Sequence, residues 1–136
     1  MKKLLFMLLA VAAGTLIVAN TVTAGVATKR AAIVHVQKGC HTWSVGALKT
    51  PNLRLSLHTG DRLAVVNQDL DMHKLVQVSG PPTNAGAFMM MNQHVALRFT
   101  KAGLYRFQTR VADMRGMPEA KTIGPDNKLV LTVRVN

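Results

Sequence analysis

A histidine stands where the chain leaves one strand-like segment and begins another. His73 closes the polar segment Asn67-Gln68-Asp69-Leu70-Asp71-Met72, and Met72 is its immediate neighbour. An imidazole beside a thioether at such a corner is typical of a soft-metal site. Residues with similar chemistry occur elsewhere in the chain: Cys40, His41, Met114 and Met117. These residues predict a metal site if the segments that carry them meet in the folded protein.

Cys40 is the only cysteine of the chain, which excludes a disulfide within one molecule. A lone thiol is often buried and inert. This one lies in Gly39-Cys40-His41-Thr42-Trp43, next to an imidazole and a glycine, and Trp43 is most simply a core or rim aromatic. Two interpretations of Cys40 therefore remain open: an inert core thiol, or a thiol used in metal binding or redox chemistry.

A further group of sulfur atoms lies in Phe88-Met89-Met90-Met91, within a segment from Pro81 to Asn92 that shows no strand periodicity. Three consecutive methionines in a loop cannot all face one core. We expect one or two to pack inward as adaptable fillers and at least one to be exposed. Exposed thioethers suit Cu(I), and a hydrophobic docking patch is an equally good interpretation.

The other three histidines are not expected to bind metal. His58 falls on the polar face of a segment in which Leu53, Leu55 and Leu57 alternate with polar residues, so it is predicted to face solvent. His35 and His94 lie in or at the edge of strand-like segments. A surface or core histidine is a simpler interpretation there than a ligand.

The N-terminus has the three parts of an export signal. Lys2 and Lys3 precede an uncharged apolar run from Leu4 to Ala19, and Val22-Thr23-Ala24 supplies small residues for a signal peptidase. We expect a cleavable signal helix over residues 1–24 and one domain over residues 25–136, located in the periplasm or secreted, with no stable membrane anchor. A retained anchor is the alternative, but the apolar run of about 16 residues is shorter than the roughly 20 that a spanning helix needs.

Basic residues outnumber acidic residues by 17 to 6, a formal charge of +11. Without Lys2 and Lys3 the exported domain carries 15 basic residues against the same 6, a formal charge of +9. Charge of this size governs partners and solubility rather than fold. Nucleic acid is not expected as a partner, because the basic residues are scattered singly and the aromatics are few. A solvated basic surface is the simplest interpretation, and an acidic protein partner or an anionic membrane surface stays open.

Apolar and polar residues alternate at residues 53–58, 62–67, 95–100, 104–111 and 128–135, which is the period of two expected of half-buried strands. Residues 31–37, 42–45 and 73–78 are further strand-like runs. Short turns at residues 59–61 and 101–103 join consecutive strands, and the second pair is hairpin-like. No amphipathic helix follows the signal. The pattern predicts an all-β, antiparallel two-sheet sandwich of seven or eight strands.

Two motifs of the domain resemble those of the cupredoxins. The run from Gly60 to His73 resembles the cupredoxin strand and corner in which the histidine after an Asn-x-Asp segment is the first copper ligand. The run from Ala102 to Thr109 resembles the cupredoxin Pro-Gly-x-Tyr-x-Phe-x-Cys strand. The similarity covers about residues 31 to 135. It implies a cupredoxin-like Greek-key β-sandwich that binds a copper ion.

The sequence departs from the cupredoxin pattern at two ligand positions. Thr109 stands where the copper-binding thiolate is expected, and no histidine follows in the next loop. An ordinary blue-copper site of two histidines, one cysteine and a weak methionine cannot be built at the usual positions. His73 carries over directly. Met114 and Met117 carry over only because they lie in the loop that holds the methionine in cupredoxins.

The resemblance also implies a way for Cys40 to replace the missing thiolate. In cupredoxins the first strand runs toward the copper-bearing end, and the loop that follows it lies near the metal; here that loop is residues 38–41. The ligands that we predict on this basis are Cys40, His73 and Met114, with His41, Met72 and Met117 as alternates. Methionine-rich segments suit the reduced ion, which favours copper storage, delivery or resistance over electron transfer.

A different class of function is left open by the fold. A sandwich that kept its core but lost its metal would serve as an interaction module, with the methionine segment as its docking surface. An enzyme is not expected. Cys40 and His41 are sequence neighbours, and a thiolate-imidazole catalytic pair needs a third group to orient it.

Overall fold

The structure is a computed structural model that describes residues 25–36, 41–111 and 128–136. The predicted signal peptide, Cys40, Met114 and Met117 lie outside these residues. The strands within the described ranges are β1 (Thr28–His35), β2 (His41–Val45), β3 (Leu48–Thr50), β4 (Asn52–Leu57), β5 (Arg62–Asn67), β6 (His73–Ser79), β7 (Phe88–Met89), β8 (His94–Arg98), β9 (Gly103–Val111) and β10 (Val130–Val135). No helix in these ranges is long and apolar enough to span a membrane.

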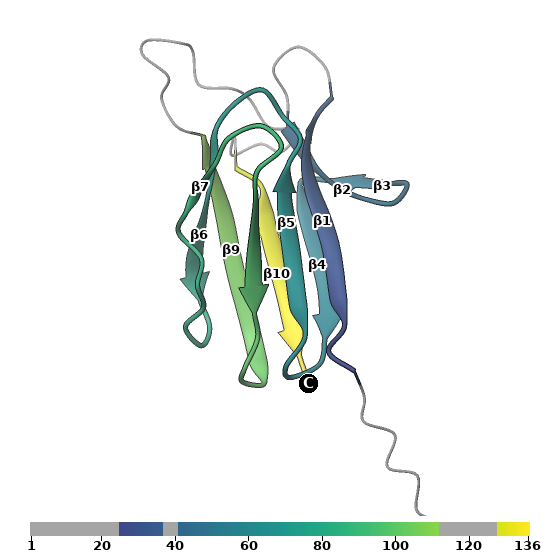
Figure 1. Ribbon diagram of the computed structural model, residues 1–136, viewed down its shortest axis with the longest axis vertical. Helices are drawn as coiled ribbons and strands as arrows, with labels where there is room; N and C mark the ends of the chain where they lie inside the picture. The colour runs from purple at the N-terminus through teal and green to yellow at the C-terminus, as the bar shows by residue number, and fades with distance from the viewer. Residues whose placement is uncertain (1–24, 37–40, 112–127) are drawn as a thin grey trace, which may run out of the picture.

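The strands form two five-stranded sheets, with the orders β3-β2-β1-β5-β8 and β4-β10-β9-β6-β7. One hydrophobic core lies between the sheets, because its buried side chains come from both, for example Ile33 and Leu63 from the first and Leu75 and Phe107 from the second. Figure 1 shows the long strands running along the vertical axis of the molecule. The predicted all-β two-sheet sandwich is confirmed.

The alternation of residue types explains why one face of each strand is buried and the other is exposed. In β9 the side chains of Tyr105, Phe107 and Thr109 are buried, whereas Arg106 and Arg110 are exposed. Burying one large apolar side chain contributes roughly 1.5–3 kcal/mol, so the alternation determines which face of the strand turns inward.

The pairing of the strands differs from the prediction in two respects. β1 pairs with β5, and β4 with β10, in parallel rather than antiparallel. The short turns after β4 and after β8 cross from one sheet to the other, so the expected hairpin of residues 95–100 with 104–111 is wrong. A period of two identifies the buried face of a strand but carries no information about its neighbour, which depends on contacts distant in the sequence.

Two short strands occur outside the segments that we predicted to be strands. β3 has 3 residues and β7 has 2 residues, and both lie at the edge of a sheet. Neither is long enough to show a periodic pattern. The remaining eight strands agree with the upper end of the predicted count.

The ends of several strands meet at one end of the sandwich. β1 and β5 are parallel and place Ile33 opposite Asn67, and β1 is antiparallel to β2 with His35 opposite His41. The corner that follows β5 leads directly into β6, which begins at His73. This end, at the top of Figure 1, therefore brings together the polar corner and the segments that carry His35, His41 and His73.

Candidate metal site

The polar corner between β5 and β6 is held by the buried side chain of Asn67. Its Nδ2 donates hydrogen bonds to the carbonyl oxygens of Asp71 (2.7 Å) and Met89 (2.8 Å). Its Oδ1 accepts one from the backbone N–H of Asp69 at 2.9 Å. An asparagine that satisfies three backbone groups fixes the path of the loop. The consequence is that Asp69 turns its carboxylate into the protein.

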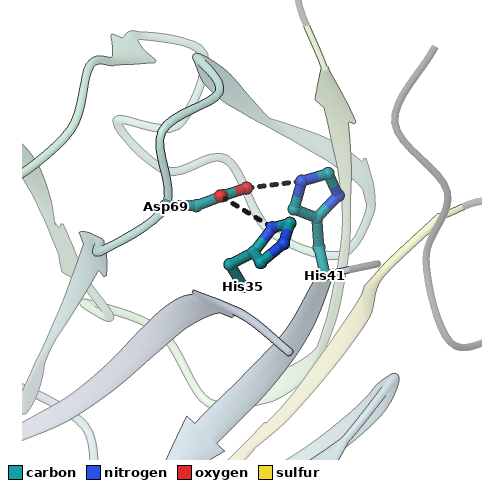
Figure 2. A group of neighbouring side chains, drawn as sticks. All are labelled: His35, His41 and Asp69. Atoms are coloured by element: carbon teal, nitrogen blue, oxygen red, sulfur yellow. Dashed lines mark ion pairs between the residues drawn. The ribbon is translucent and has the colours of Figure 1, made fainter. Parts of the chain in front are cut away.

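Asp69 is fully buried beneath two buried imidazoles. Its Oδ2 lies 2.5 Å from Nε2 of His41 and 2.9 Å from Nε2 of His73. Its Oδ1 lies 3.4 Å from Nδ1 of His35, whose side chain is 42% exposed. Figure 2 shows the Asp69 carboxylate facing the rings of His35 and His41, with a dashed line to each. One carboxylate therefore orients three histidines from three different strands.

The two buried rings lie against each other. The centroids of His41 and His73 are 4.7 Å apart, with the ring planes at 85°. His41 comes from β2 of the first sheet and His73 from β6 of the second. Nε2 of His41 also lies 3.1 Å from Oδ2 of Asp71. The pair thus bridges the two sheets at the end where the core closes.

The hydrogen bonds of these rings indicate their tautomers. A nitrogen that faces a carboxylate is the protonated, donating nitrogen, so Nε2 of His41 and of His73 carries the hydrogen. In neutral rings Nδ1 then holds a lone pair. Both Nδ1 atoms are buried, and neither has a hydrogen-bond partner among the residues that the structure describes. Burial lowers the pKa of His73 below its ordinary value of 6.5 and so favours the neutral ring. The hydrogen bond to Asp69 acts in the opposite direction but is the smaller effect.

This arrangement fits a metal ion. A metal-bound histidine typically uses one ring nitrogen for the metal and donates the other N–H to a carboxylate, which fixes the ring and makes it more basic. His41, His73 and Asp69 have the carboxylate half of that arrangement, and two lone pairs have no partner within the part of the chain that the structure describes. Neutral imidazole is a ligand for copper, zinc, iron and nickel.

A second coordination mode uses a different set of atoms. His35, His41 and Asp69 each offer one ligand atom, and these three atoms lie within 4.8 Å of one another. A metal held there would take the atoms that now form the histidine-aspartate contacts. The mode through the two Nδ1 atoms keeps those contacts.

The structure brings some of the predicted site residues together. His73 and its alternate His41 share Asp69, and Met72 is partly buried next to His73. The remaining predicted ligands, Cys40, Met114 and Met117, lie outside the described residues, and their participation stays a prediction.

Two members of the cluster were missed by the sequence prediction. Asp69 was read only as part of the polar corner, and His35 as an uninvolved histidine. The signal for Asp69 was its place between Asn67 and His73, but one acid in a polar loop has the pattern of a solvated residue. His35 is placed by its register opposite His41, which a local pattern does not reveal.

Other sequence predictions are confirmed at the level of burial. His58 and His94 are exposed, and Trp43 is fully buried in the core. Thr109 is buried, and its hydroxyl oxygen accepts a hydrogen bond from the backbone N–H of Leu129 at 3.3 Å. The residue at the position of the cupredoxin thiolate therefore has a structural role.

The methionine segment divides as expected. Met89 is 1% exposed and packs in the core, whereas Met90 and Met91 are 61% and 49% exposed. Met89 pairs with His73 between β7 and β6, and its carbonyl oxygen is held by Asn67. Two exposed thioether side chains therefore follow directly on a residue that contacts the histidine corner.

Comparison with known proteins identifies cupredoxins among solved structures. A purple cupredoxin from Nitrosopumilus maritimus is 13% identical with a TM-score of 0.47, over 77% of this chain and 98% of that chain. A variant of amicyanin in its reduced Cu(I) form at pH 4 is 18% identical with a TM-score of 0.46, over 84% of this chain and 87% of that chain. No family model matches the sequence, and no curated protein matches it. At these identities and TM-scores the likeness carries no argument about function.

Proposed function

We propose that the protein binds copper at the polar corner, as an exported copper-handling protein. The observation that carries the proposal is the pair of buried Nδ1 atoms of His41 and His73, which lack a hydrogen-bond partner among the described residues while both Nε2 atoms face Asp69. A buried lone pair without a donor costs free energy. A bound metal ion would remove that cost at both rings.

Copper is the metal that the sequence favours. The motifs from Gly60 to His73 and from Ala102 to Thr109 resemble those of cupredoxins. Cys40, directly before His41, and Met114 complete the proposed ligand set from outside the described residues. A thiolate and a thioether beside two imidazoles suit copper better than a harder ion.

Copper handling is favoured over electron transfer by the methionine segment. Met90 and Met91 expose their thioethers one and two residues after Met89, which pairs with His73. Adaptable, exposed thioethers suit the capture and release of Cu(I). An electron-transfer role is distinguished by a measurement: a site for electron transfer keeps its copper in both oxidation states and exchanges electrons reversibly at an electrode.

The test is a copper titration of the purified protein, followed by absorption spectroscopy and metal analysis. We expect one copper per chain and, for Cu(II), an intense visible charge-transfer band from the Cys40 thiolate. Cys40→Ala removes the band, and His73→Ala or His41→Ala weakens binding by at least about tenfold. His58→Ala is the matched control, because that histidine is exposed, and it leaves binding unchanged.

The same titration examines the competing function. The exposed side chains of Leu70, Phe88, Met90 and Met91 are consistent with a metal-free interaction module. Such a module would bind no stoichiometric copper, and Cys40 would react equally fast with a thiol reagent with and without copper. Those two results together would overturn the copper proposal.

A further inference from the structure

A basic hollow lies on the outer face of the second sheet, at the end of β9 far from His73. It has a volume of about 510 Å³ and is lined by side chains of β4, β9 and β10. Three arginines stand in it, Arg54, Arg106 and Arg134, all exposed. His73 pairs with Val111 at the other end of β9, so the hollow is separate from the candidate metal site.

Strand register explains why the three guanidinium groups share one face. Thr132 lies on β10, between β4 and β9. Arg54 of β4 is opposite Thr132 on one side, and Arg106 of β9 is opposite it on the other side. Arg134 lies two residues further along β10 and therefore points to the same side of the sheet. Neighbouring strands are about 4.8 Å apart, and two residues along a strand span about 6.7 Å. The arginines thus form a triangle of cations around Thr132.

No carboxylate balances this triangle within the described ranges. The acidic residues there are Asp61, in the turn before β5, and Asp69 and Asp71, in the polar corner. The ion pairs found among the described residues all join histidine to aspartate, and none involves an arginine. Like charges on neighbouring strands are destabilising. An anion bound among the arginines would attract each of them and so offset their mutual repulsion.

The uncharged groups of the hollow add to its chemistry. Ser56 and Thr132 place hydroxyl groups among the arginines, and Leu104 adds an apolar wall. Nζ of Lys29 donates a hydrogen bond to the carbonyl oxygen of Ser56 at 2.7 Å, which brings a further cation to the edge. Guanidinium groups bind phosphate and carboxylate through two parallel hydrogen bonds, and a phosphate group offers three acceptor oxygens where a carboxylate offers two, so one phosphate can serve more than one of these arginines. A volume of this size is within the range of small-molecule sites.

We propose that this hollow binds a small ligand that carries two or more phosphate groups. Its phosphate oxygens accept hydrogen bonds from Arg54, Arg106 and Arg134, and the hydroxyl groups of Ser56 and Thr132 donate to the oxygens that remain. The ligand enters a recess rather than resting on a plane, which distinguishes it from a membrane surface. The site is independent of copper binding at the polar corner.

The test is calorimetric titration of the purified, metal-free protein with tripolyphosphate. We expect saturable binding that weakens at least about tenfold in Arg134→Gln and in Arg106→Gln. Arg98→Gln is the matched control, because Arg98 is an exposed strand arginine of the other sheet. It removes the same charge and should weaken binding less than about twofold. His73→Ala should leave tripolyphosphate binding unchanged, which separates the hollow from the metal site.

Three results would overturn the proposal. One is an absence of tripolyphosphate binding. Another is an equal loss of affinity for tripolyphosphate in Arg98→Gln and in Arg134→Gln, which would indicate that the ligand is attracted by the net charge of the protein alone. The third is binding to poly-glutamate or to anionic phospholipid vesicles without binding to tripolyphosphate, which would assign the face to an acidic protein or to a membrane.

Discussion

One carboxylate oxygen of Asp69 faces two imidazoles, and this is the central feature of the site at the level of single residues. Oδ2 lies within hydrogen-bond distance of Nε2 of both His41 and His73. A neutral amide with its oxygen at this place would carry no negative charge, and its nitrogen would replace Oδ1, which now accepts a hydrogen bond from the backbone N–H of Leu70 at 2.7 Å. It would therefore hold the two rings less strongly.

Substitution of Asp69 should consequently lower metal affinity without removing any proposed ligand atom. We expect Asp69→Asn to weaken copper binding by roughly 10–100-fold, the usual cost of losing the carboxylate behind a metal-bound histidine. Competition with a chelator of known affinity measures it. Asp71→Asn is the control, because the Asp71 side chain is 36% exposed and makes one longer contact with His41. An equal effect of both changes would contradict the orienting role of Asp69.

The lowered pKa of His73 makes the stability of the metal-free protein depend on pH. Burial favours the neutral ring in the folded state, so the unfolded chain binds a proton more readily. The stabilising contribution is present above the unfolded value of 6.5 and is lost as the pH falls through the lower folded value. Urea denaturation at pH 7.5 and at pH 5 should show a fall in the free energy of unfolding. His73→Gln should reduce that fall, and an undiminished fall would assign it to other groups.

At the level of elements, the end of β6 depends on a close approach that only glycine allows. A Cβ on Gly80 would lie 2.6 Å from the carbonyl oxygen of Leu104 and 2.9 Å from Cα of Tyr105, and φ is +103°. Gly46 has a φ of +57° but open space around it. The two glycines share a positive φ and differ in crowding, so they form a matched pair.

Alanine at these two positions should separate backbone strain from packing. Gly46→Ala should cost about 1–2 kcal/mol, the cost of a left-handed conformation with a Cβ. Gly80→Ala should cost at least about 1 kcal/mol more, because β9 backbone would have to move. Chemical denaturation measures both free energies of unfolding. Equal losses would mean that β6 and β9 can separate at this point without cost.

For the strands, the sequence predicts which face is buried but not which strands pair. The alternation of Tyr105 and Phe107 with Arg106 identifies the buried face of β9, because that pattern is local. The parallel pairing of β1 with β5 and the crossing of the β8-β9 turn between sheets could not be read in this way, because pairing depends on distant contacts. The same holds for the candidate site. His73 was predicted from its motif, which is local, whereas the burial of Asp69 could not be predicted because it depends on the loop path that Asn67 fixes.

At the level of the whole molecule, the candidate site connects the two sheets. His41 belongs to β2 in the first sheet, and His73 belongs to β6 in the second. Apart from the hydrophobic core, their shared contact with Asp69 is a polar connection between these layers. A metal bound to both rings would add a connection that the unfolded chain lacks.

Copper should therefore raise the stability of the entire domain. A ligand at 100 times its dissociation constant stabilises the folded state by about 2.7 kcal/mol, which corresponds to a rise in Tm of about 10 °C or more for a domain of roughly 110 residues. Thermal denaturation with and without copper measures the shift, and a chelator should reverse it. His41→Ala and His73→Ala should each abolish most of the shift, since each removes the link to one sheet. His58→Ala should retain it, because His58 is exposed. Retention of the full shift in both the His41 and the His73 variants would place the copper away from this corner.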